Sequence, residues 1–211
     1  MIAVLGGSFD PIHIGHLRIA IEVRDQLQVD EVRLIPCGQP PHRDPFIANA
    51  DQRLQMLQLA IADEPALRVD DREIRHNRLS YTVDTLTDLR QEVGHQPLCL
   101  IIGADAYQQL NSWHQWTQLL ELAHLLVVQR PGYSVTTSAE VANYTANRFI
   151  EDTQQLTQQN AGSVYFLQAP PLEISSTRIK TLLAEHKSIR YLVPDSVFQW
   201  LQQNPIYHSA Q

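Results

Sequence analysis

Short apolar runs alternate with amphipathic stretches along this 211-residue chain. The apolar runs have the length of buried strands, and Gly, Pro or polar turn residues follow them. The pattern predicts six strands, at residues 2–5, 31–36, 67–69, 98–102, 125–128 and 164–167. Between the strands, apolar residues recur at the spacing of one helix face, which predicts helices.

The helices are expected in the following places. The first begins near His13, a second follows a cap at Asn49 or Asp51, and a third follows Ser80. Further helices are expected past Trp113 to residues 119–122, over 140–156, after residues 174–177 and over 195–203. The polar, Gln-rich stretch 134–160 suggests no function.

Strands that alternate with helices at this spacing predict right-handed βαβ units. The expected fold class is therefore α/β, a Rossmann-like, mainly parallel sheet with helices on both faces. We expect one domain over residues 1–211, with the helical part from about residue 174 packed on it. Ligands of such folds bind outside the carboxyl ends of the strands, where the strand order reverses.

Composition narrows the classes of partner. Hydrophobic residues make up 44% of the chain and charged residues 18%, as in ordinary soluble globular proteins. There is no apolar run of the roughly 20 residues that a membrane helix needs, and no secretory leader pattern, so we expect a cytoplasmic protein. Sixteen basic against 23 acidic residues give a net charge of −7, which argues against nucleic acid or an anionic membrane as partner. Cys37 and Cys99 are too few for a disulfide framework and are expected to be buried small side chains.

The stretch IAVLGGSFDPIHIGH, residues 2–16, has the features of an anion site. Its glycines let backbone N–H groups approach a phosphate, and the following helix start adds its positive dipole end. His13 and His16 are three residues apart, so both rings can face one way and donate to developing charge. The alternatives are a core histidine with a helix cap, or zinc ligands joined by Cys37 and His42.

Three more polar clusters follow strands, at residues 36–43, 103–105 and 175–180. Pro40-Pro41-His42-Arg43 is either a stiff turn or a loop that presents a cationic pair to a phosphate. Asp105 is either a helix cap or an acceptor for ribose hydroxyls. Ser80 and Thr82 are explained by capping alone, and Trp113 and Trp116 by core packing, although Trp113 can also stack on a flat cationic ring.

The motif GGSFDPIHIGH resembles the signature of the nucleotidyltransferase superfamily, in the form typical of bacterial nicotinate-nucleotide adenylyltransferases. Other stretches resemble segments of the same family in family order, namely PPHR, SYTVDTL, IIGAD, LNSWHQW and ISSTRIK. The resemblance runs from the first strand to the helix after Ser175 and implies the fold of the HxGH nucleotidyltransferases.

The resemblance also implies an activity in NAD biosynthesis. The adenylyl group of ATP would pass to nicotinate mononucleotide, which gives deamido-NAD and pyrophosphate, with Mg²⁺ held through the ATP phosphates. Another small adenylyltransferase, with phosphopantetheine or nicotinamide mononucleotide as acceptor, and a non-catalytic nucleotide sensor of the same fold remain alternatives. The resemblance fixes no oligomeric state, and a homodimer is compatible with it.

Carried over motif by motif, the resemblance implies the following roles. Catalysis falls to His13, His16 and Lys180, and no protein residue is expected to bind a metal. ATP is expected to contact Gly6, Gly7, Ser8, Phe9, His16, Gly103, Asp105, Ser175, Ser176, Thr177 and Lys180. Nicotinate mononucleotide is expected to contact Ser8, Phe9, His42, Arg43, Thr82, Trp113 and the main chain of His114. Two positions depart from the family pattern, since Lys180 stands where the motif has Arg and His114 where relatives often have Tyr.

Overall fold

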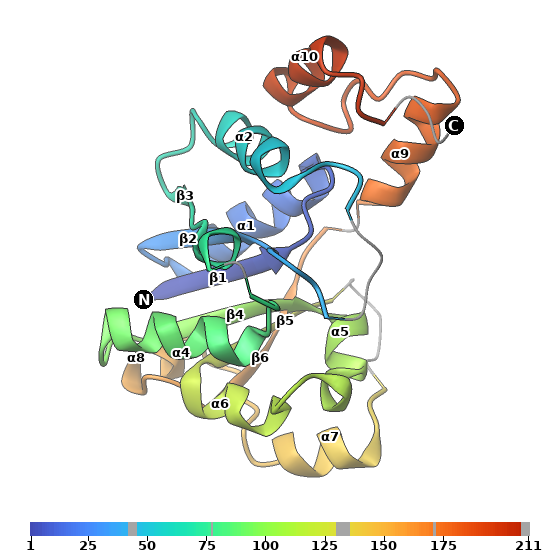
Figure 1. Cartoon of the computed structure of the whole chain (residues 1–211). Coiled ribbons are helices and arrows are strands. Elements are labelled where there is room, and N and C mark those ends of the chain that lie inside the picture. Colours follow the sequence, from blue (N-terminus) through green and yellow to red (C-terminus); the bar gives the residue numbers. More distant parts are fainter. Residues whose placement is uncertain (42–45, 77, 130–135, 171, 208–211) are drawn as a thin grey trace.

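A computed structural model describes residues 1–211 apart from 42–45, 77, 130–135, 171 and 208–211. Its centre is a six-stranded parallel sheet in the order β3-β2-β1-β4-β5-β6, which confirms the α/β, Rossmann-like fold class (Figure 1). The strands are β1 (Ile2–Gly7), β2 (Glu31–Pro36), β3 (Leu67–Val69), β4 (Leu98–Gly103), β5 (His124–Gln129) and β6 (Val164–Gln168). All six predicted strands therefore form. The order reverses beside β1, because the chain runs out to β3 and then returns to β4 on the other side of β1.

Helices connect the strands. They are α1 (Ile14–Leu27), α2 (Ala50–Ala60), α3 (Arg72–Arg75), α4 (Thr82–Val93), α5 (Ala104–Gln108), α6 (Leu119–Leu122), α7 (Ala139–Thr145), α8 (Gln155–Gln158), α9 (Ser176–Ala184) and α10 (Asp195–Gln203). Two single-turn 3₁₀ helices, η1 (Leu110–Ser112) and η2 (Trp116–Gln118), precede α6. No helix in the described part of the chain is both long and apolar enough to cross a bilayer.

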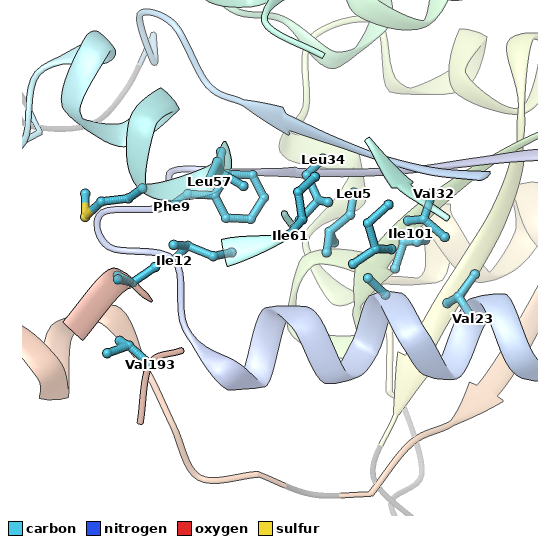
Figure 2. Close-up of a cluster of buried hydrophobic side chains, with 14 of the residues drawn as sticks. Leu5, Phe9, Ile12, Val23, Val32, Leu34, Leu57, Ile61, Ile101 and Val193 are labelled. Carbon is cyan, nitrogen blue, oxygen red and sulfur yellow. The ribbon is translucent and has the colours of Figure 1, made fainter. Parts of the chain in front are cut away.

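The two faces of the sheet bury separate clusters of apolar side chains. Ala3 and Leu5 of β1 face the cluster formed with α1, α2, α9 and α10, which Figure 2 shows in close-up. Ile2 and Val4 face the cluster formed with α4, α5 and α6. Because β1 is covered on both faces, its apolar residues run without polar interruption, as is typical of parallel sheets. Figure 1 shows the two helix layers above and below the sheet.

Side chains at the helix starts explain where several helices begin. The Asn49 side chain accepts a hydrogen bond from the Gln52 N–H, and the Gln52 side chain accepts one from the Asn49 N–H. Of the two expected caps, Asn49 and Asp51, Asn49 is therefore the cap of α2. The capping interpretation of Ser80 and Thr82 is wrong. Tyr81 occupies the cap position of α4 without a side-chain bond, and Ser80 Oγ instead accepts from the N–H groups of Gly38 and Gln39.

The helix expected to continue past Trp113 is interrupted. Trp113 has an extended backbone (ψ 142°), and Gln115 has a left-handed one (φ 48°), so the chain turns twice before α6 begins. The turns raise Trp113 towards the carboxyl edge of the sheet, a place that a continuous helix would not give it.

The helix expected over residues 140–156 is wrong as a single element. Helix α7 ends at Thr145, and the chain then runs beside β6, the edge strand. There the Val164 N–H donates to the Arg148 carbonyl, and the Ile150 N–H donates to the Val164 carbonyl. These bonds satisfy the open backbone groups of the edge strand, a gain that outweighs the weak helix preference of this polar stretch.

Candidate active site

Two adjoining cavities open at the carboxyl edge of the sheet. One has a volume of about 320 Å³ and is lined by the end of β1 and Ser8, by Gly103 at the end of β4, and by Glu73, Thr82 and Trp113. The other, of about 400 Å³, is lined by Pro40, Pro41, Ser80, Tyr81, Thr82, Gln109, Ser112, Trp113 and His114. Thr82 and Trp113 border both cavities. The loops after β1, β2 and β4 therefore meet at one edge, as the strand topology requires.

The loop after β1 is shaped by Phe9. Its ring is fully buried and folds back over Gly7, and its backbone is left-handed (φ 47°). A Cβ atom on Gly7 would lie 3.0 Å from the ring, so a residue larger than glycine would fit here only if the ring shifted. A Cβ atom on Gly6, in contrast, would meet nothing within 4 Å. The backbone at Gly6 thus borders open space in which a phosphate can approach.

His13 and His16 lie face to face at the start of α1. Their ring centroids are 3.6 Å apart, with an interplanar angle of 23°. His13 is the cap residue of α1, and its Nδ1 accepts the His16 N–H at 3.4 Å. Because Nδ1 accepts, the proton of a neutral His13 ring lies on Nε2, which is the nitrogen left to donate to a ligand. The predicted common orientation of the two rings is confirmed.

Burial keeps both rings neutral at pH 7. It lowers the pKa of His13 to about 4. Burial and the neighbouring His13 lower the pKa of His16 to about 3. His16 Nδ1 is buried without a hydrogen-bond partner among the described residues. The His16 ring packs edge to face with the Phe9 ring, and the ring centroids are 5.1 Å apart. An unpaired buried nitrogen is costly, and an anionic ligand that accepted a hydrogen bond from His16 Nδ1–H would relieve that cost.

Asp10, three residues before His13 in the buried part of the loop, accepts an unusually large number of hydrogen bonds. Its side chain is 2% exposed and accepts bonds from four groups. These donors are the Ile47 N–H at 3.2 Å, the Ala48 N–H at 3.1 Å, Lys180 Nζ at 3.1 Å and the Tyr207 hydroxyl at 2.6 Å. Burial alone would raise the pKa of Asp10, but the Tyr207, Ala48 and Lys180 bonds together hold it below its ordinary value. The charged form is therefore the stable one.

Arg53 of α2 makes a hydrogen bond to the same loop. Its side chain is 1% exposed, and Nη1 donates to the Ser8 carbonyl at 2.9 Å. Its guanidinium lies 4.2 Å from the centre of the Phe46 ring, a cation–π contact. The Ser8 carbonyl is therefore engaged by the guanidinium of Arg53.

The start of α9 lies against this loop. Ser175 Oγ caps the helix by accepting the Arg178 N–H at 3.2 Å, and Ser176 Oγ donates to the Pro11 carbonyl at 2.9 Å. Thr177 is exposed at the same helix end. The serine hydroxyls are thus engaged by the protein, and it is the first-turn N–H groups of α9 that suit phosphate oxygens.

The second cavity is built from the start of α4 and the loop of η1. Tyr81 and His114 pack ring to ring, with centroids 4.4 Å apart, and Trp113 is half-buried beside them. Below them, Glu73 accepts the Thr85 hydroxyl at 2.7 Å. Burial raises the pKa of Glu73. A Cβ atom on Gly38 would lie 2.2 Å from the Glu73 carbonyl oxygen, so the loop after β2 passes here only because it carries glycine.

Asp105 lies in the first turn of α5, where Gly103 holds the cap position without a side-chain bond. The helix-cap interpretation of Asp105 is therefore wrong. Its Oδ1 would stand 2.6 Å from a Cβ atom on Gly103, so the carboxylate folds back over the end of β4. Asp105 is exposed, and it is not among the residues that line either of the two cavities.

Some expectations receive no support. His42 and Arg43 lie outside the described residues. No group of three or more His, Cys, Asp or Glu side chains in the described part of the chain could hold a metal ion, so a zinc site with His13 and His16 has no support there. Cys99 is buried as expected, and Cys37 is half-buried at the first cavity.

Three residues of this edge have no counterpart among the sequence expectations. They are Arg53, Glu73 and Tyr207. Arg53 stands three and four residues before Met56 and Leu57, which are fully buried, so its place on the apolar face of α2 was a usable signal. Glu73 and Tyr207 lie in stretches without a local pattern that singles them out.

Comparison with known proteins gives consistent results. A family model described as cytidylyltransferase-like matches residues 4–182. The probable nicotinate-nucleotide adenylyltransferase of Methylococcus capsulatus is 44% identical over 208 residues, 98% of this chain and 99% of the relative. The one of Hahella chejuensis is also 44% identical over 208 residues, 98% of this chain and 95% of the relative.

Among solved structures, the Plasmodium falciparum nicotinic acid mononucleotide adenylyltransferase complexed with NaAD superposes with a TM-score of 0.75. It shares 16% sequence identity, and the match covers 98% of this chain and 96% of that one. At this identity the likeness supports the fold alone.

Proposed function

This chain belongs to the cytidylyltransferase-like family, among the nicotinate-nucleotide adenylyltransferases, and from that premise we propose that it makes deamido-NAD from ATP and nicotinate mononucleotide. The observation that carries the proposal is the stacked His13–His16 pair at a glycine loop, next to a cavity bordered by Thr82 and Trp113. The protein would act as a single nucleotidyltransferase domain in the cytoplasm, where its substrates occur.

The reaction needs alignment and charge stabilisation more than proton transfer. A 5′-phosphate oxygen of the mononucleotide attacks the α-phosphorus of ATP in line, the new P–O bond forms, and the bond to the leaving pyrophosphate breaks. The attacking phosphate is already an anion, so no general base is required. His13 Nε2–H and the backbone N–H groups at residues 7–9 donate to the charge that builds up on the α-phosphate.

Neutral histidines suit this task. Before the substrate binds, the two rings are neutral dipoles in a buried site, which avoids burying two adjacent positive charges. Phosphate oxygens next to the rings favour the protonated forms and strengthen the donated hydrogen bonds as charge develops.

The ring end of the mononucleotide is assigned to the second cavity. The Thr82 N–H and the dipole of the α4 start suit the nicotinate carboxylate, and Trp113 suits the face of the pyridinium ring. The main chain of His114 borders the same cavity. His42 and Arg43 remain the proposed contacts of the mononucleotide phosphate.

The ATP end is assigned to the other loops. Asp105 beside Gly103 suits the ribose hydroxyls. The N–H groups of Ser176 and Thr177 at the start of α9, together with Lys180, suit the departing pyrophosphate.

The side chains of the site indicate how Mg²⁺ would be held. With no cluster of three candidate ligands among the described residues, Mg²⁺ would be held by phosphate oxygens and water. When bound, it supplies charge neutralisation on the β and γ phosphates. Lys180 and the α9 N–H groups do the same from the protein side.

The test is a coupled assay on the purified protein with ATP and one of three acceptors. We expect pyrophosphate release with nicotinate mononucleotide, and a kcat/KM at least tenfold lower with nicotinamide mononucleotide because the helix start recognises a carboxylate. Equal use of both forms, or preference for phosphopantetheine, would overturn the acceptor assignment. Nucleotide binding without pyrophosphate release from any mixture would instead identify a sensor.

A further inference from the structure

Tyr207 lies outside every motif recognised in the sequence, yet its hydroxyl contacts the loop after β1 at the candidate site. It follows α10, its side chain is 4% exposed, and its hydroxyl donates to Asp10 Oδ1 across 197 positions of sequence. It packs in the cluster that covers the α1 face of the sheet. The hydroxyl of a buried tyrosine needs a hydrogen-bond acceptor, and here the acceptor is the Asp10 carboxylate in the loop after β1.

The Asp10 carboxylate is saturated in this structure. Its two oxygens offer about four lone-pair positions in total, and each oxygen accepts hydrogen bonds from two donors. Oδ1 accepts from Ala48 N–H and Tyr207, and Oδ2 accepts from Ile47 N–H and Lys180. Lys180 is the only one of these donors that carries a charge and stands on a partly exposed, flexible side chain.

We propose that Tyr207 is a positioning residue for adenylyl transfer, which acts through Asp10 on the availability of Lys180 to the leaving pyrophosphate. The inference rests on the proposed function. Lys180 is paired with Asp10 in this structure, 3.1 Å away, so to serve the pyrophosphate it must share or leave that pair. Asp10 can release it without stranding a buried charge only if the remaining donors hold the carboxylate.

Tyr207 supplies the strongest of those remaining bonds, the one at 2.6 Å. Without its hydroxyl, Oδ1 keeps a single backbone donor, and Asp10 depends more on the ammonium group. Burial and the nearby Asp10 raise the pKa of Tyr207, so the residue stays a hydroxyl donor throughout the neutral range. The expected consequence of losing the hydroxyl is a Lys180 held on Asp10 and away from the triphosphate.

A double-mutant cycle on the whole protein tests the inference. The variants are Tyr207→Phe, Lys180→Met and the two combined. Tyr107→Phe is the matched control, since Tyr107 is 2% exposed and its hydroxyl bonds to Thr145 at 2.8 Å in the cluster on the other face of the sheet. The measurements are kcat, KM for each substrate, the melting temperature, and the affinity for inorganic pyrophosphate by calorimetry.

We expect Tyr207→Phe to lower kcat/KM for ATP and the affinity for pyrophosphate by about tenfold each, the scale of one hydrogen bond to a charged group. The KM for nicotinate mononucleotide should stay within about twofold. In the Lys180→Met background, Tyr207→Phe should add less than about twofold, because the residue through which it acts is gone. Tyr107→Phe should lose similar thermal stability with kinetics within about twofold of the parent protein.

Additive losses in the double variant would overturn the inference, and so would a Tyr207→Phe protein that behaves like the Tyr107→Phe control. Failure of the proposed function is recognised separately. If the parent protein forms no dinucleotide, calorimetry with pyrophosphate on the same five proteins still decides whether Tyr207 acts through Lys180.

Discussion

The two halves of the candidate site are built in opposite ways. The phosphate half, from the loop after β1 to the start of α9, is buried and is held together by hydrogen bonds between polar groups, with Asp10 2% and His13 5% exposed. The ring half, formed by the start of α4 and the loop of η1, is open, with Trp113 half-buried and His114 exposed. The first half fixes donors in a low-dielectric setting, where they act strongly on developing charge. The second half offers a surface on which a planar ring can settle.

The two halves are therefore expected to control different kinetic constants. Groups fixed before the substrate arrives act most on the transition state and so on kcat. Groups that recognise a spectator ring contribute equally to ground state and transition state and so act on KM. Substitutions in the two halves should therefore separate the two constants.

The largest separation is expected at His13. His13→Ala removes the Nε2–H donor, and kcat should fall by about 10²- to 10³-fold while the fold persists. The lost helix cap should cost about 1 kcal/mol of unfolding free energy. His13→Asn is the control, because Asn restores the cap acceptor without the distant donor, so stability should recover and kcat should not. Near-normal kcat in either variant would contradict the catalytic role.

In the ring half, Trp113→Ala should raise the KM for nicotinate mononucleotide by about tenfold to a hundredfold, the scale of one lost base–aromatic stack. The KM for ATP and kcat should change little. Trp116→Phe is the comparison variant, since the Trp116 ring packs against Tyr144, 4.9 Å away, and should leave both KM values alone. A fall in kcat without a rise in KM would place Trp113 in the phosphate half.

Acid should weaken the phosphate half first. The folded-state pKa values of His13 and His16, about 4 and 3, lie below the ordinary 6.5. Between those limits the unfolded chain binds more protons, so stability falls as the pH drops from about 6.5 towards 4. Between pH 7 and pH 5 the loss should be about 2 kcal/mol for His13 alone. Asp10 affects stability at lower pH. Because its pKa lies below the ordinary value, its contribution to the free energy of unfolding is lost only when the pH falls below about 4.

Denaturant unfolding at pH 7 and pH 5 measures this loss. In His13→Asn the difference between the two pH values should shrink by about 2 kcal/mol. An unchanged pH dependence in His13→Asn would show that the ring is not held neutral in the folded protein.

The smallest effect is expected from Lys180→Arg, which restores the residue of the family motif. A guanidinium can contact Asp10 and a phosphate oxygen at the same time, so the KM for ATP should fall by about twofold to threefold with kcat unchanged. Steady-state kinetics with ATP varied measures it. A loss of more than about tenfold would show that the compact ammonium group is itself required.

The sequence predicted the sheet better than the loops, for physical reasons. β4 was readable because LCLII is buried on both faces and must be apolar throughout. The break after Thr145 was not, because it depends on the open edge of β6, which is formed later in the chain.

The candidate site divides in the same manner. His13, His16 and Ser175 are local to their motifs, and short-range rules of helix starts placed them. Asp10 with Lys180 and Tyr207 joins groups 170 and 197 positions apart, and no local spacing reports such a contact. For Arg53, the spacing from Met56 and Leu57 indicates the buried face of α2, but its partner, the Ser8 carbonyl 45 positions away, is found only in the fold.

The neighbouring glycines after β1 lack side chains for different reasons. Gly7 yields its space to an aromatic ring of the protein, whereas the space at Gly6 is kept for something the protein does not supply. A methyl group placed there by Gly6→Ala would leave the melting temperature near that of the parent while it blocks nucleotide entry. Such a stable but inert protein would let a cell-based experiment separate loss of the enzyme's product from loss of the polypeptide itself.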